Sequence, residues 1–271
     1  MLKIVRLIVS LAVITLFTAC ATITPPLTDD KTKNLRNGKS VVIFSDPNHQ
    51  INYLEDIYMV LAVSQEASTS SYNGIWNSEK DLAAIHTEEL SKIGLDVTSI
   101  HDSMSSTDIT EFKPLLDELD SLSKSQSSGG FGFNKSGDTE NGVHKKINNK
   151  LRLKLKEKGY DYLFWISSPG LTLHLKALGL PPWQYFNHTY RVYDLSRNEL
   201  VWGSPLGILY TDVEKIPEGQ TGKQFLESNN LAGLKRDTKK IIREYYNMKD
   251  KSKRISYLIG LEKITKTAPA N

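Results

Sequence analysis

A single cysteine, Cys20, closes an uncharged N-terminal run, and this arrangement constrains how the remaining chain can fold. Lys3 and Arg6 are followed by 11 residues without charge, from Leu7 to Phe17, and the small residue Ala19 stands directly before the cysteine. A basic start, a short apolar stretch and a small residue at the cleavage position are typical of a secretory signal peptide. One cysteine cannot form an intramolecular disulfide, so the chain must fold on its hydrophobic core alone.

The stretch Leu16-Phe17-Thr18-Ala19-Cys20-Ala21 resembles the lipobox of bacterial lipoproteins, with Phe17 in the place of the usual leucine. The resemblance implies that residues 1–19 are removed as a signal peptide and that the Cys20 thiol receives diacylglycerol. Lipid chains, palmitate among them, would then anchor the protein in the bilayer. In that family an Asp after the cysteine favours retention in the inner membrane. Ala21 therefore implies the outer membrane, with the protein facing the periplasm.

Two other interpretations of the leader remain open. It could be an uncleaved transmembrane anchor, although a helix needs about 20 apolar residues to span a bilayer. Cys20 could also be an ordinary buried cysteine, but its position at the end of an apolar leader disfavours this. Lipidation explains the position best, and a lipoprotein carries the two or three chains that stable anchoring requires.

The balance of basic and acidic residues bears on whether the protein binds nucleic acid. The chain has 271 residues with 34 Lys+Arg and 31 Asp+Glu. Both Lys3 and Arg6 lie in the leader, so its removal leaves 32 basic against 31 acidic residues, a net charge of +1. Such a balance gives no reason to expect nucleic-acid binding. The length fits one large domain, which we place at residues 39–262.

Three segments have the composition of flexible chain. Residues 20–38 are polar and contain Pro25-Pro26, so we expect a flexible tether between the anchor and the domain. Residues 121–142 are rich in serine and glycine, which predicts a disordered loop inside the domain. Residues 263–271 should form a loose tail.

The periodicity of apolar residues predicts alternating strands and helices. Strands are expected at 40–45, 57–63, 95–100, 160–168 and 171–176, with a polar loop at 64–73. Helices are expected at 77–93, 107–123 and 141–158, and as one long helix after Thr221, which begins a T-x-x-Q capping box. Residues 183–195 and 200–202 should form a hairpin, and residues 255–261 a last strand.

This order predicts an α+β (or α/β) fold, with a mixed β-sheet flanked by helices and an antiparallel hairpin in the C-terminal half. The run Leu163 to Ile166 shows no polar face, which indicates a central strand covered on both sides.

The stretches GYDYLFWI and YRVYDLSRNELVWG, followed by a last helix, are similar to the periplasmic α/β lipoprotein domains of the curli-secretion and penicillin-binding-protein-activator kind. Those domains often carry Asp before a hairpin turn and Trp after it, which Asp194 and Trp202 match. The resemblance implies a module for assembly or partner binding.

No motif points to a cofactor, a metal or a catalytic centre. Residues 129–136 come within one residue of a phosphate-binding loop, but Asn134 replaces the second glycine and no buried strand precedes it. The six histidines lack the spacing of zinc ligands. Ser167 and Ser168 end a predicted central strand, where active sites often lie. We therefore keep an envelope hydrolase with its site near these serines as the alternative function.

The favoured function is a non-enzymatic binding or assembly module for an envelope protein or glycan. Its candidate partner-binding residues are Trp183, Tyr185 and Phe186, which follow the Pro181-Pro182 turn. Trp and Tyr often dominate the energetics of protein interfaces. The alternative is that these rings fold into the core.

Overall fold

A computed structural model describes residues 27–46, 48–59, 62–127, 139–140, 143–144, 146–168, 170–176, 183–212, 219–228, 230–249, 255 and 259–260. The described strands are β1 (Lys39–Ser45), β2 (Gln50–Met59), β3 (Ala62–Ser71), β4 (Asp96–Ser99), β5 (Thr139–Glu140), β6 (Val143–His144), β7 (Tyr162–Ser167), β8 (Leu171–Lys176), β9 (Trp183–Asp194) and β10 (Glu199–Asp212). The described helices are α2 (Asp29–Asn37), α3 (Ser78–Lys92), α4 (Ile100–Ser103), α5 (Ser106–Ser127), α6 (Asn149–Glu157), α7 (Gly222–Ser228) and α8 (Ala232–Tyr246).

Eight of the strands form one mixed sheet in the order β3-β2-β8-β9-β7-β1-β4, with β10 on the other side of β9. β1 runs parallel to β4 and β7, and β2 runs parallel to β8. β9 is antiparallel to β7 along its second half and to β8 along its first half. The expected α+β fold with a mixed sheet and a C-terminal antiparallel hairpin is confirmed.

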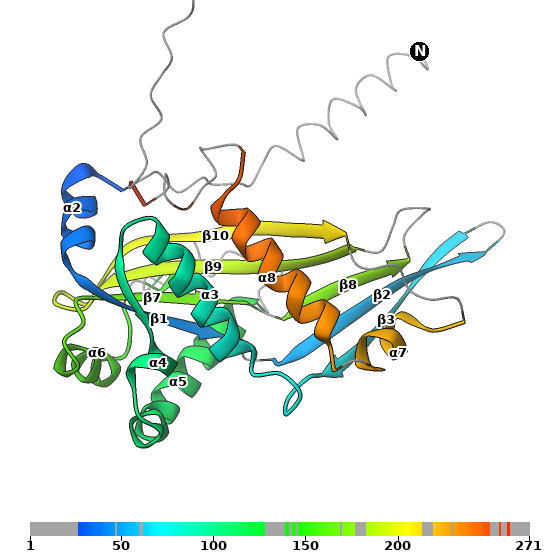
Figure 1. Cartoon of the computed structure of the whole chain (residues 1–271), viewed down its shortest axis with the longest axis horizontal. Helices are drawn as coiled ribbons and strands as arrows, with labels where there is room; N and C mark the ends of the chain where they lie inside the picture. Colours follow the sequence, from blue (N-terminus) through cyan, green and yellow to red (C-terminus); the bar gives the residue numbers. More distant parts are fainter. Residues whose placement is uncertain are drawn as a thin grey trace, which may run out of the picture.

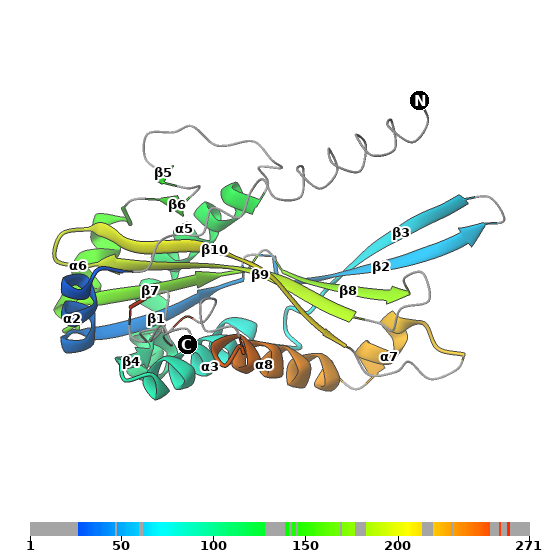
Figure 2. The same ribbon diagram turned by 90° about the horizontal axis from the view of Figure 1, so that it is seen from above.

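The sheet has two parts, which we call the body (β4, β1, β7 and the second half of β9) and the arm (β3, β2, β8 and the first half of β9). β1 continues into β2 after a bend at residues 46–49, and β7 continues into β8 after a bend at residues 168–170. Helices α3 and α8 cover one face of the body, and α5 and α6 cover the other, while the β2–β3 hairpin extends past them (Figures 1 and 2).

Alternation of side chains places the body between two apolar cores. On β1, Val42 and Phe44 belong to the core under α3 and α8, whereas Val41 and Ile43 belong to the core under α5 and α6. All six residues of β7 are buried. The prediction of a central strand covered on both faces is therefore confirmed.

The tether prediction for residues 20–38 is wrong from Asp29 onwards, where the chain forms α2. Leu35 is fully buried, and Thr32 donates a hydrogen bond from Oγ1 to the Ile259 carbonyl at 3.2 Å. Asp29 and Asp30 in the first turn and Arg36 in the last turn suit the helix dipole. One buried leucine and one buried threonine, three residues apart, are sufficient to dock this otherwise polar helix. Residues 20–26 lie outside the described part.

The serine-rich loop prediction for residues 121–142 is also wrong in part. α5 continues to Ser127, and the short strands β5 and β6 pair with each other. Residues 128–138 and 141–142 lie outside the described residues, as does the tail at 263–271. Residues 64–71 form β3 rather than a loop, because small polar side chains suit an edge strand whose backbone pairs with β2.

Two helix predictions change at their boundaries. α6 begins at Asn149, because the Asn148 side chain accepts a hydrogen bond from the Lys150 backbone N–H at 2.8 Å. The predicted long C-terminal helix is two helices, α7 and α8, separated at Leu231, where φ is +61°. The T-x-x-Q capping box is confirmed, because Thr221 and Gln224 exchange hydrogen bonds of 3.1 and 3.2 Å.

The last predicted strand is wrong as well. The Ile259 N–H donates to the Ile255 carbonyl at 2.9 Å, which is a helical turn. Among the residues that the structure describes, no helix combines the length and the apolar character that crossing a membrane would need.

Candidate functional site

Ser167, one of the two serines of the hydrolase alternative, lies at the carboxyl edge of the body. The parallel pairing of β1 and β7 sets Ser167 beside Ser45. Ser167 Oγ accepts a hydrogen bond from Arg191 Nη1 at 2.9 Å. Trp165 Nε1 donates to Ser45 Oγ at 2.9 Å, so both serine hydroxyls are bonded to large buried side chains.

Arg191 is the unexpected member of this group. The residue is 1% exposed, and its guanidinium carbon lies over the Trp165 ring, 4.0 Å from the ring centroid. Burial lowers the pKa of Arg191 to about 10, so the side chain stays protonated at neutral pH. Stacking on an indole partly offsets the cost of burying a cation. Ser167 therefore helps to hold a buried guanidinium, and its hydroxyl faces a cation rather than a base.

Ser168 begins the bend between β7 and β8. Its backbone N–H donates to the Ser45 carbonyl at 3.0 Å, and its Oγ donates to the Gly170 carbonyl at 3.1 Å. A side chain at Gly170, where φ is +116°, would meet the Gln50 carbonyl at 2.9 Å. Ser168 and Gly170 together hold the bend between β7 and β8 close to the end of β1 and the start of β2.

A second polar cluster surrounds Asp46 at the bend between β1 and β2. Its Oδ2 accepts hydrogen bonds from Tyr72 Oη and from Ser78 Oγ, the latter at 2.6 Å, and its Oδ1 accepts the His49 backbone N–H at 3.3 Å. His49 Nδ1 lies 4.0 Å from Oδ2, and the backbone of His49 has a positive φ of 44°. Burial raises the pKa of the Asp46 carboxyl, while the bonds from Ser78 and Tyr72 act in the opposite direction.

These contacts show which groups lie beside the serine hydroxyls at the strand ends, where the hydrolase alternative needs a general base. A serine nucleophile needs its hydroxyl beside a general base. Ser78 Oγ donates to the Asp46 carboxylate and Ser167 Oγ accepts from the Arg191 guanidinium, so the side-chain partner of each hydroxyl is a residue other than histidine. The arrangement instead ties the first turn of α3, the end of β3 and the end of β1 to one carboxylate.

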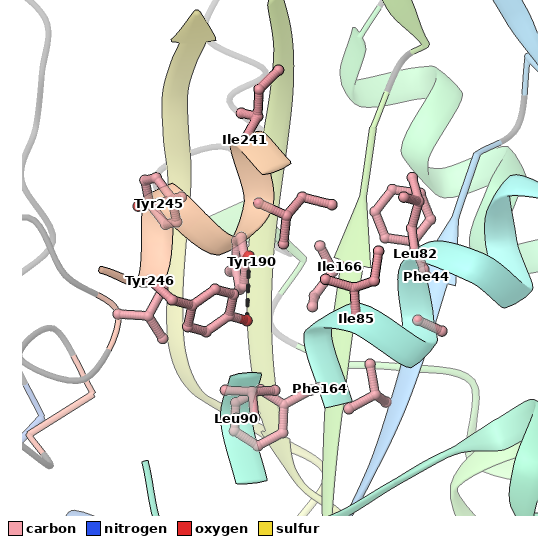
Figure 3. Packing of buried hydrophobic residues seen from close by; sticks show 14 of the residues in the cluster. Phe44, Leu82, Ile85, Leu90, Phe164, Ile166, Tyr190, Ile241, Tyr245 and Tyr246 are labelled. Atoms are coloured by element: carbon pink, nitrogen blue, oxygen red, sulfur yellow. Dashed lines mark hydrogen bonds between the residues drawn. The ribbon is translucent and has the colours of Figure 1, made fainter. Parts of the chain in front are cut away.

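Two histidines lie in the core between the sheet and the helices α3 and α8. His86 on α3 and His188 on β9 are 0% and 1% exposed, with ring centroids 5.3 Å apart. His86 Nδ1 lies 3.0 Å from Tyr246 Oη and 2.9 Å from Tyr190 Oη. The two tyrosine hydroxyls are joined by a hydrogen bond of 3.4 Å (Figure 3). Burial lowers the pKa of His86 to about 3, and burial together with His86 lowers the pKa of His188.

The described residues contain no group of three or more His, Cys, Asp or Glu side chains arranged to hold a metal ion. His174 pairs across β8 and β9 with Trp183, five residues along β9 from His188. His174 and His188 therefore do not lie opposite each other across these strands.

A shallow polar pocket of about 270 Å³ lies at the opposite, amino-terminal edge of the body. It is lined by Asn34, Asn37, Gly38, Asp161, Tyr162, Asp194 and Ser196. A methyl group at Gly38 would come within 2.5 Å of the Tyr162 ring, so only glycine leaves room for that ring. Asp194 Oδ1 accepts the Ser196 and Arg197 N–H groups at 2.7 and 3.1 Å, so this aspartate caps the β9–β10 turn.

The partner-binding candidates Trp183, Tyr185 and Phe186 lie on β9 in the arm. Their backbones pair with β8 on one side and with β10 on the other. Gln184, which alternates with them, is fully buried and donates from Nε2 to Thr238 Oγ1 on α8 at 2.7 Å. The side chains of the three candidates lie outside the described set, as does the whole of Cys20.

The sequence pattern singled out Ser167 and Ser168 but missed Asp46, Tyr72 and Arg191. Asp46 follows a buried parallel strand directly, and that position was a usable signal. Arg191 offered none, because its contact with Trp165 depends on the register between β7 and β9.

No family model matches this chain, and no curated protein matches it. One similar solved structure is the lipoprotein GNA1162 from Neisseria meningitidis, with a TM-score of 0.33, 10% identity, and 74% of this chain and 98% of that chain covered. Another is the hypothetical protein CT253 from Chlamydia trachomatis, with a TM-score of 0.31, 14% identity, and 76% and 92% covered. Both scores are too low to establish a shared fold, and both identities are too low to transfer a function.

Proposed function

We propose that the protein is a lipoprotein anchored through Cys20 in the outer membrane, where it acts as a non-enzymatic binding or assembly module in the periplasm. The observation that carries the proposal is the position of the one cysteine, directly after a basic start, an uncharged run and a small residue.

The polar groups at the strand ends support binding over hydrolysis. Ser167, Ser45 and Ser78 are each hydrogen-bonded to a side chain that orders the bends. In the arm, β2 and β3 extend beyond the helices that cover the body (Figure 2), while the first half of β9 packs one face, through Gln184, against α8. We place the partner-binding surface on the arm, at Trp183, Tyr185 and Phe186, where aromatic residues can supply most of the binding energy.

Replacing Cys20 with Ser tests the anchor. In cells supplied with a palmitate analogue, the wild-type protein should incorporate the label and sediment with membranes, because only a cysteine thiol can form the thioether. The Cys20→Ser variant should lose both properties. Retained label or unchanged fractionation in that variant would overturn the proposal.

A photo-crosslinking amino acid at position 185 tests the binding surface. With the lipidated protein in its own membranes, we expect a crosslinked species that disappears when Trp183 and Phe186 are replaced by Ala. The matched control carries the same crosslinker at Ala84, an exposed residue of α3. Equal crosslinking at both positions, or no effect of the alanine substitutions, would contradict a surface on the arm.

A further inference from the structure

The N-terminal end of the described chain is firmly part of the domain. Leu27 is 9% exposed and belongs to the core under α3 and α8, together with Leu35, Ile255 and Ile259. A side chain at Gly260, where φ is +76°, would collide with Thr32 Oγ1 at 2.2 Å and approach the Leu27 carbonyl to 3.1 Å. Leu27 and α2 therefore move with the domain as one unit.

The chain between Cys20 and Leu27 is short. Leu27 is seven positions after Cys20, with six residues between them, two of which are Pro25 and Pro26. Fully extended, seven residues span at most ~25 Å, and a flexible chain of that length averages ~13–16 Å. A lipid on Cys20 would therefore hold the first turn of α2 close to the phospholipid headgroups.

Charge differs between the segment that contains α2 and the segment that contains β2 and β3. Residues 27–39 contain Lys31, Lys33, Arg36 and Lys39 against Asp29 and Asp30, a net charge of +2. Residues 50–71, which form the β2–β3 hairpin, contain three acidic and no basic residues, a net charge of −3. An anionic lipid surface attracts the first segment and repels the second.

The two segments also lie far apart in space. α2 is at one end of the longest axis of the molecule, and β2 and β3 extend toward the other (Figures 1 and 2). β1 in the body and β2 in the arm follow one another along this axis. Because a strand rises about 3.3 Å per residue, the combined length of the two strands separates α2 from the far end of the arm. The short link can bring only the α2 end to the bilayer unless the whole domain lies flat, which the charge of the hairpin opposes.

We propose that the end of the domain formed by α2 and the Ile259–Gly260 turn is a membrane-facing surface that rests on anionic phospholipid headgroups, with the β2–β3 hairpin directed away from the bilayer. The inference rests on the lipid anchor proposed above and adds the orientation of the anchored domain. It leaves the arm free to meet a partner in the periplasm or across it.

The test uses the lipidated full chain, reconstituted in vesicles of phosphatidylethanolamine and phosphatidylglycerol. Because lipid blocks the Cys20 thiol, a cysteine introduced by Lys31→Cys or by Thr69→Cys can be labelled alone; both positions are exposed. A spin label on the lipid headgroup should quench a fluorophore at position 31 at least about twofold more than one at position 69, given the ~25 Å reach of the link. Equal quenching, or stronger quenching at position 69, would overturn the proposed orientation.

A charge reversal on α2 tests whether its lysines are attracted to the anionic headgroups. Lys31→Glu with Lys33→Glu should reduce quenching at a cysteine placed at Thr28 in the anionic vesicles and leave it unchanged in vesicles without phosphatidylglycerol. The matched control reverses Lys80 and Lys223, which are exposed on α3 and α7. An equal effect of both pairs, or of neither, would contradict contact between α2 and anionic headgroups.

The measured mass of the protein in the same preparation distinguishes a failure of the lipid anchor from a failure of the proposed orientation. A chain that carries lipid at Cys20 but shows the wrong quenching order contradicts the orientation alone. A chain without lipid contradicts the anchor, and the orientation with it.

Discussion

At the bend between β1 and β2, the Asp46 carboxylate joins three elements that are distant in sequence. Tyr72 follows β3, Ser78 begins α3, and both donate to Asp46 Oδ2 in the interior. A buried hydroxyl that loses its partner costs about 1–3 kcal/mol. The stability of this corner of the molecule should therefore depend on the acceptor at position 46 more than on its charge.

We predict that Asp46→Ala lowers the free energy of unfolding by about 2–4 kcal/mol, because two buried hydroxyls lose their acceptor. The control is Asp46→Asn, which keeps one side-chain oxygen and removes the buried charge, and which should cost less than about half as much. Urea denaturation at neutral pH measures both. If Asp46→Ala is as stable as the wild type, the cluster does not hold the bend.

The buried pair His86 and His188 makes the core sensitive to acid. Both rings are neutral in the fold because burial lowers their pKa. The rings that face them are Phe44 on β1, Tyr190 on β9 and Tyr246 on α8, while Glu89 on α3 is already paired with Lys92 and Arg243. The unfolded chain, in contrast, takes up protons on both histidines near their ordinary pKa of about 6.5.

Stability should therefore fall as the pH drops below about 6.5, because protons bind the unfolded state first. Between pH 7.5 and 5.5 the expected loss is about 1.4 kcal/mol for each histidine, or about 2.7 kcal/mol for the pair. His188→Gln should remove about half of this pH dependence, whatever its effect at pH 7.5. Urea titrations at both pH values provide the measurement, and a wild-type stability that is constant or rises on acidification would contradict neutral buried histidines.

At the scale of elements, α2 shows how a short polar sequence becomes part of a core. The helix has nine residues, of which Thr32 and Leu35 are buried. Truncating a fully buried leucine to alanine costs about 2–5 kcal/mol, whereas exposed positions change stability little.

We expect Leu35→Ala to lower the free energy of unfolding by about 2–5 kcal/mol. Lys33→Ala, an exposed change on the same helix, should stay within about 0.5 kcal/mol of the wild type. Equal and negligible effects of the two substitutions would mean that α2 behaves as the tether that its composition suggests.

Elements buried on both faces could be predicted from the sequence, and sparsely buried elements could not. β1 and β7 are continuous apolar runs, and α3 carries its own cap at Asn77, which accepts the Lys80 N–H. α2 and β3 have few apolar residues; α2 depends on the Ile259 turn far away in the chain, and β3 is held by backbone pairing with β2 rather than by an apolar face. For the same reason, the serines at the strand ends could be found by pattern, but their partners Arg191 and Asp46 required the register of the sheet.

At the scale of the whole molecule, α2 and the arm lie toward opposite ends of the longest axis (Figure 1). The short link would place the body near the bilayer and the aromatic residues of β9 on the distant half of the sheet. Binding of an envelope partner and anchoring would then use opposite ends of one domain.

The covalent state of Cys20 tests this account most directly. Mass spectrometry of the N-terminal peptide, from protein extracted from membranes, should show a chain that begins at Cys20 and carries diacylglycerol on the thiol and an acyl chain on the amine. A chain that retains residues 1–19, or that begins at another residue with a free Cys20 thiol, would contradict it.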